Sequence, residues 1–228
     1  MRTPLLRDST LLALLLAVPA LAVAHGVSSG DAAFVTATRG IHPGPFAYLG
    51  AKHMVTGYDH LAFLAGVIFL LRHLRDVAVY ASLFALGHSI TLLATVLLGW
   101  HADAHLVDAA IGLSVVYKGF ENIGGFQGTW WRLDPRVAVF GFGLVHGTGL
   151  ATKLQELHLA RDGLVANLLA FNFGVELGQL AALALMVLLF ALWRGTRSFN
   201  RAILPANTLL MTVGFVLAGY QLAGYLLA

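Results

Sequence analysis

The sequence predicts an all-α membrane protein, a polytopic bundle of about six transmembrane helices. Of its 228 residues, 58% are hydrophobic and only 11% are charged, and the apolar residues gather in long runs. Soluble domains carry about 25% charged residues. A bilayer offers the backbone no hydrogen-bond partners, so each apolar run is expected to be a helix.

The first 24 residues predict a cleavable signal peptide. An apolar stretch, Leu11–Val18, follows two arginines and precedes the A-x-A cleavage pattern Ala22-Val23-Ala24. An uncleaved first helix is the alternative. Cleavage would leave His25 at the mature N-terminus, where the α-amine and imidazole could chelate a metal. Residues 25–50 are then a short periplasmic lead-in, and residues 51–228 are the six-helix transmembrane domain.

Six apolar stretches follow the lead-in, and each is long enough to cross a bilayer. They are Ala51–Leu71, Val77–Trp100, Leu106–Ile123, Val137–Leu154, Leu164–Trp193 and Ala202–Ala228. Two G-x-x-x-G patterns, Gly143/Gly147 and Gly174/Gly178, predict close approach of neighbouring helices.

The loop charges predict the orientation of the chain. Arginines gather between the first and second, third and fourth, and fifth and sixth stretches: Arg72, Arg75, Arg132, Arg136, Arg194, Arg197 and Arg201. Positively charged loops stay in the cytoplasm. We therefore expect a bacterial inner-membrane protein with both mature termini on the periplasmic side, in agreement with an exported N-terminus.

Several ionisable side chains lie inside the apolar stretches. They are His53, Asp59, His60, His88, His146 and Glu176. From the start of each stretch, His88, His146 and Glu176 lie about 16, 14 and 18 Å deep, near the middle of a core about 30 Å thick. Each would cost about 2.5 kcal/mol or more facing lipid. We therefore expect them to face one another or a wet cavity.

Three further residues are secondary candidates. Asn172 and Gln179 share a helical face with Glu176, which predicts one polar lining. Glu121 lies three residues after Lys118, so it is either a structural ion-pair partner or a ligand at an inner exit. The alternative for all these residues is a purely structural role, in which they form hydrogen bonds between helices.

The composition limits the chemistry of such a site. The chain has no cysteine, so thiolate metal sites and disulfides are excluded. Imidazole and carboxylate ligands suit Ni(II), Cu(II), Co(II), Zn(II) or Fe(II), and no organic cofactor is expected. Asp59 is either a direct ligand or the acceptor that orients a ligating histidine. No block of Lys and Arg indicates nucleic-acid binding.

The segment HMVTGYDH, from His53 to His60, resembles the H-x-x-x-x-x-D-H signature of the HupE/UreJ family. GHSITL, FGLVHGTGLA and FNFGVELGQL resemble further motifs of its second, less characterised branch. The resemblance implies a multi-helix permease, with nickel the substrate proposed for hydrogenase- and urease-linked members, and metal contacts at His53, Asp59 and His60. The paired His-Gly box of the nickel-linked branch is reduced here to one unit, His146-Gly147.

The leading hypothesis is therefore transport of a divalent transition metal, nickel first and copper or cobalt next, and not enzymatic catalysis. An intramembrane metal-dependent hydrolase or oxidase acting on a lipid-like substrate is one alternative. A non-catalytic accessory subunit for metalloenzyme maturation is another. The expected partners are the lipid bilayer and the metal ion, with a homo-oligomer or an accessory complex left open.

Overall fold

The computed structural model describes residues 29–130, 133–156 and 161–227. The predicted signal peptide and His25 lie outside these residues. The described residues form eight helices and no strand, which confirms the all-α prediction. In chain order they are α2 (Ser29–Ala37), α3 (Pro43–Thr56), α4 (Tyr58–Ile68), α5 (Leu74–Leu98), α6 (Ala104–Asn122), α7 (Pro135–Glu156), α8 (Leu164–Arg194) and α9 (Arg197–Leu227).

Among the described residues, four helices are long and apolar enough to cross a membrane on their own: α5, α7, α8 and the Ser198–Leu227 part of α9. The expected number of six such helices is therefore not established. The other two predicted spans, the first and the third, are built differently, and each difference has a physical cause.

The first predicted span is not one continuous helix. It is divided at Gly57, where α3 ends and the apolar 11-residue α4 begins. A Cβ on Gly57 would lie 2.9 Å from Nδ1 of His60 and 3.1 Å from the carbonyl oxygen of His53. The break therefore depends on a residue without a side chain. It places Asp59 and His60 in the first turn of a new helix.

The third predicted span, α6, carries three charged residues, and each is paired. Lys118 Nζ lies 2.7 Å from Glu121 Oε2 on the same helix. Asp108 is bonded by Lys153 of α7, with Nζ–Oδ2 3.0 Å. These pairs neutralise charge that would otherwise be costly at membrane depth. They explain how a helix of modest hydropathy belongs to the bundle.

Three helix pairs form the frame of the bundle: α3 with α8, α5 with α7, and α6 with α9. Each contact passes through glycine. A Cβ on Gly174 would overlap backbone atoms of α3, one on Gly143 would overlap α5, and one on Gly112 would lie 2.8 Å from a backbone nitrogen of α9. Two of these glycines belong to the G-x-x-x-G patterns. Small residues let the backbones approach closely where the surrounding lipid supplies no hydrophobic driving force.

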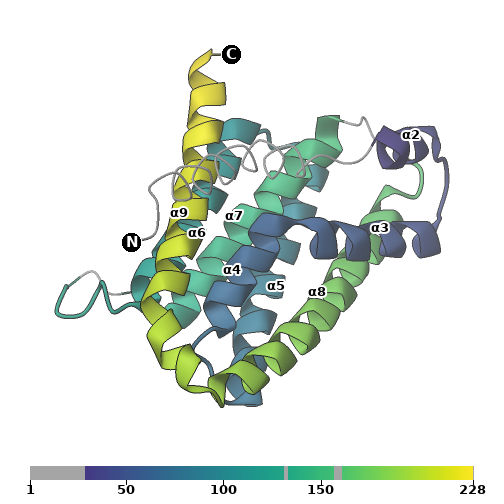
Figure 1. Ribbon diagram of the computed structural model, residues 1–228. Coiled ribbons are helices and arrows are strands. Elements are labelled where there is room, and N and C mark those ends of the chain that lie inside the picture. The colour runs from purple at the N-terminus through teal and green to yellow at the C-terminus, as the bar shows by residue number, and fades with distance from the viewer. Residues whose placement is uncertain (1–28, 131–132, 157–160, 228) are drawn as a thin grey trace, which may run out of the picture.

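Helix α4 lies in the middle of this frame, between α6 and α8 (Figure 1). It buries Phe63, Leu64, Val67 and Ile68, each at most 3% exposed. Outer faces of the long helices carry exposed leucines and phenylalanines, as lipid contact requires. The centre of the bundle is thus a short helix whose first turn carries the buried Asp59 and His60.

Candidate metal centre

His60 is the centre of the candidate site. It lies in the first turn of α4 and is 3% exposed. Its Nδ1 lies 2.9 Å from Oδ1 of Asp59, which is 2% exposed. A carboxylate can only accept, so Nδ1 donates the proton and the lone pair of His60 is on Nε2. This is the arrangement in which a carboxylate orients a metal-ligating histidine.

Three further imidazoles surround His60, each from a different helix. The ring centroids of His146 (α7), His53 (α3) and His88 (α5) lie 4.9, 5.2 and 5.9 Å from that of His60. Two of these imidazoles are almost completely enclosed, His146 at 0% exposed and His88 at 1%. The fold therefore gathers four imidazoles from four helices in the interior.

A potential chelating group lies within this cluster. One ligand atom each from Asp59, His60 and His146 lie within 4.8 Å of one another, and all three residues are buried. Ligand atoms bound to one ion at about 2.1 Å lie within about 4.2 Å of each other. The three atoms are thus close to the spacing that a shared ion requires.

Ser114 of α6 orients His146. Its hydroxyl donates to the carbonyl of Ile111 at 2.7 Å, so its oxygen must accept from Nε2 of His146 at 3.1 Å. A neutral imidazole has one N–H, so this hydrogen bond leaves the lone pair of His146 on Nδ1. Both central histidines are therefore held in defined tautomers, one by a carboxylate and one by a hydroxyl.

Several buried imidazole nitrogens of the cluster have no protein partner and are suited to bind an ion. Within the described part of the chain, Nε2 of His60, Nε2 of His53 and both ring nitrogens of His88 are buried and have no hydrogen-bond partner. Such groups are rare in folded proteins because burying them unpaired is costly. Apolar walls from Phe63 and Phe84, whose rings lie 5.4 and 5.1 Å from His146, exclude solvent.

The polar residues of α8 do not join the cluster. Asn172 donates to Oγ of Ser89 at 2.7 Å, and Gln179 donates to the carbonyl of Ala81 at 3.0 Å. Both face α5, as a shared helical face predicts, but Glu176 lies on the exposed surface of α8. The structure therefore does not place Glu176 beside the central histidines, where the sequence predicts it.

Glu121 lies near the C-terminal end of α6, where its carboxylate accepts a hydrogen bond from Lys118. The adjacent Asn122 donates to the carbonyl of Gly66 at 2.8 Å and to Oδ1 of Asn207 at 2.9 Å. These bonds tie α4, α6 and α9 together. The local geometry thus matches the structural alternative for Glu121.

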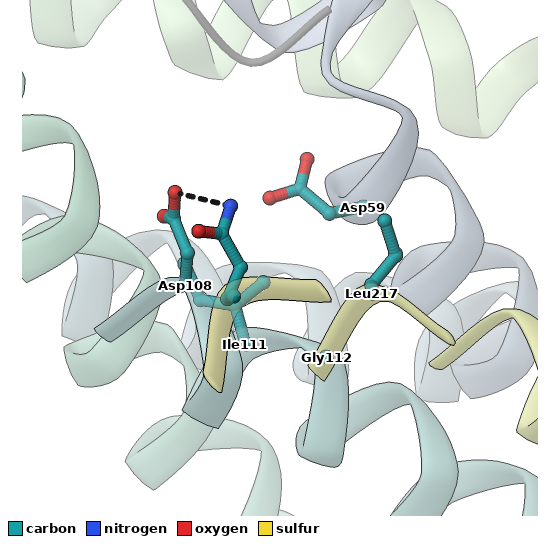
Figure 2. A pocket seen from close by; sticks show the side chains of 6 residues that line it. Asp59, Asp108, Ile111, Gly112 and Leu217 are labelled. Carbon is teal, nitrogen blue, oxygen red and sulfur yellow. Dashed lines mark hydrogen bonds between the residues drawn. The ribbon is translucent and has the colours of Figure 1, made fainter. Parts of the chain in front are cut away.

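Sequence reasoning missed two features of the site. Ser114 gave no signal, since a serine in an apolar helix usually bonds its own backbone. Asp108 did give one, because an acidic residue inside an apolar stretch is expensive and needs a partner. Together with Gln221 it faces Asp59 across a small cavity of about 10 Å³ (Figure 2).

The donor set of the cluster is nitrogen and oxygen only, which suits borderline divalent transition metals. A family model described as HupE / UreJ protein matches residues 29–228. Comparisons with curated proteins and with solved structures give no match.

Proposed function

The chain belongs to the HupE/UreJ family, and on that premise we propose that it is a membrane permease for a divalent transition metal. Nickel is the first choice of substrate, with cobalt or copper next. The metal is the transported substrate. Asp59, His60 and His146 are its proposed ligands within the protein, and His53 and His88 lie next to His60.

One observation carries this proposal: imidazoles from four helices converge on a buried position where a helix is broken. Discontinuous helices with ion sites at the break are typical of secondary transporters. The imidazole nitrogens come from two of the glycine-mediated pairs, α3–α8 and α5–α7, and from α4 at the break. A shift of one pair against another would therefore change the coordination and release the ion.

The size of the neighbouring cavity favours an ion over a lipid-like substrate. At about 10 Å³ it has room for about one water molecule or a bare ion. Pockets that bind organic molecules measure about 300 Å³ or more. This argues for transport over the hydrolase or oxidase alternative.

The proposal includes the route of biogenesis and the orientation. Residues 1–24 direct export, residues 25–50 form the periplasmic lead-in, and residues 51–228 form the transmembrane domain. Both termini of the mature chain then lie on the periplasmic side of the inner membrane. On this topology the ends of α5 and α7, and the start of α6, face the periplasm.

The test measures bound metal and uptake on the same preparations. Purified protein is incubated with Ni²⁺, and bound metal is counted by mass spectrometry; proteoliposomes then report uptake of radioactive Ni²⁺. His60→Ala and His146→Ala are compared with His101→Ala, a matched control whose exposed ring bonds the carbonyl of Gly99.

Wild type and the His101 variant are expected to bind and transport Ni²⁺. Both central variants should lose more than about tenfold in affinity, since even an outer partner of a ligand contributes that much. Repeating the measurement with Co²⁺, Cu²⁺ and Zn²⁺ ranks the metals. Bound metal and uptake unchanged in both central variants would eliminate the proposal.

A further inference from the structure

Asp59 has a second environment, on the side away from the imidazoles. There it borders the cavity of about 10 Å³, whose far wall includes Asp108 and Gln221 (Figure 2). Ile111, Gly112 and Leu217 complete the lining. Helices α6 and α9 supply every lining residue except Asp59. The cavity thus connects the first turn of α4 with the polar groups at one end of the α6–α9 pair.

Asp108 is already occupied by an internal cation. Lys153 of α7 places Nζ 3.2 and 3.0 Å from its two carboxylate oxygens. Gln221 of α9 adds a third donor, with Nε2–Oδ2 3.2 Å. The side-chain oxygen Oε1 of Gln221 lies 2.8 Å from Nδ1 of His105. Asp108 is therefore held by side chains from two other helices.

This network leads from the interior to the surface. Asp59 is 2% exposed, whereas the side chains of Asp108 and Lys153 are 11% and 19% exposed. His105 lies in the first turn of α6 and Lys153 in the last turn of α7. Exposure thus rises step by step from the metal cluster to one end of the bundle. On the proposed topology this end faces the periplasm.

An ion taking this route meets Asp108 before it meets Asp59. To engage that carboxylate it must displace the ammonium group of Lys153. Coulomb attraction doubles for a doubly charged ion at equal distance. A divalent cation can therefore replace the ammonium where a monovalent one competes poorly.

We infer that the Asp108–Lys153 ion pair is a cation-operated gate between this end of the bundle and the cluster at Asp59 and His60. An arriving divalent cation takes Asp108 from Lys153, and Asp59 then receives it across the cavity. Lys153 is a positioning residue that keeps the route closed to monovalent cations. The inference rests on the proposed transport function and identifies the access side of that site.

The test separates access from binding. Asp108→Asn removes the receiving charge, and Lys153→Met removes the resting cation while keeping the length of the side chain. A second Lys–Asp pair offers matched controls: Lys52→Met and Asp31→Asn disrupt a partly buried ion pair of 2.6 Å whose residues do not line the cavity. Elution from a sizing column confirms that each variant is folded.

Initial uptake of Ni²⁺ into proteoliposomes should fall about tenfold or more at low Ni²⁺ in Asp108→Asn, because steering by one charge is lost. Equilibrium binding of Ni²⁺ in detergent should stay at the wild-type level. Lys153→Met should lower KM for Ni²⁺ and make uptake sensitive to competing Na⁺. Neither control variant should change uptake.

Three results would overturn the gate. The first is wild-type transport by both Asp108→Asn and Lys153→Met. The second is a loss of bound Ni²⁺ in Asp108→Asn as large as that in His60→Ala, which would make Asp108 part of the binding site. The third is a single variant that does not fold while the double variant, Asp108→Asn with Lys153→Met, folds and transports normally. Wild-type protein that binds no metal overturns the proposed function itself, and with it the gate. The last outcome is distinct because it is visible before any variant is made.

Discussion

Replacing Asp59 by asparagine is expected to weaken Ni²⁺ binding about 10- to 100-fold, because the carboxylate holds His60 and the loss of such a partner of a ligating histidine alone has that effect. The carboxylate oxygen and Nδ1 of His60 are 2.9 Å apart, and both residues are at most 3% exposed. Asparagine keeps an acceptor of nearly the same shape but removes the charge, and a neutral hydrogen bond is roughly half as strong. His60 then loses part of its orientation and basicity but remains present.

The expected loss corresponds to about 1.4 to 2.7 kcal/mol of binding free energy. Competition between the purified protein and a fluorescent chelator measures it, with His60→Ala as the reference for a lost ligand. Thermal unfolding without metal controls for the fold. An unchanged affinity would refute a role for Asp59 in holding His60. A loss as large as that of His60→Ala would mean that direct ligation by Asp59 outweighs its hydrogen bond to His60.

Three other substitutions test the hydrogen bonds, the packing and the topology. Ser114→Ala should weaken Ni²⁺ binding about two- to tenfold, since one net hydrogen bond of about 0.5 to 1.5 kcal/mol no longer fixes its imidazole partner; wild-type affinity in the same chelator assay would contradict the tautomer assignment. Gly87→Ala should destabilise the fold by about 1 to 3 kcal/mol, because its Cβ would lie 2.5 Å from a backbone oxygen of α7. The control is Gly141→Ala, which should leave the stability unchanged because nothing lies within 4 Å of its Cβ. Thermal unfolding in detergent compares the two variants, and equal melting temperatures would refute the close helix contact. The chain has no cysteine, so single cysteines at Ala102 and Thr196 can be labelled with an impermeant maleimide in intact cells; only the first should react, and the reverse result would invert the proposed topology.

The sequence was sufficient to predict the helical class and to single out the histidines that meet in the interior. Apolar runs of bilayer length predict helices without further information, since no other backbone arrangement survives in lipid. Counting along the runs also placed His88 and His146 at one level, and both lie next to His60. The glycine patterns predicted close contacts, and Gly143 and Gly174 make them.

Other features depend on tertiary contacts that the sequence does not encode locally. A rise of 1.5 Å per residue gives depth but not direction around the helix axis. Counting therefore could not show on which side of α8 Glu176 lies, and its side chain is exposed. The break at Gly57 was also hidden, because glycine occurs inside membrane helices without breaking them. The break at this position follows from the space that His60 and the carbonyl of His53 occupy, which a Cβ on Gly57 would enter.

The break explains why the cluster can exist at all. In a continuous helix, Asp59 and His60 would lie among backbone groups that are already bonded to each other. The start of α4 instead leaves N–H groups without helical partners, and the partial positive charge at a helix N-terminus stabilises a nearby carboxylate. Asp59 occupies this first turn, so the charge that orients His60 is itself stabilised by the break. The short helix, the missing Cβ at Gly57 and the buried acid thus form one device, and the imidazoles of α3, α5 and α7 are arranged around it.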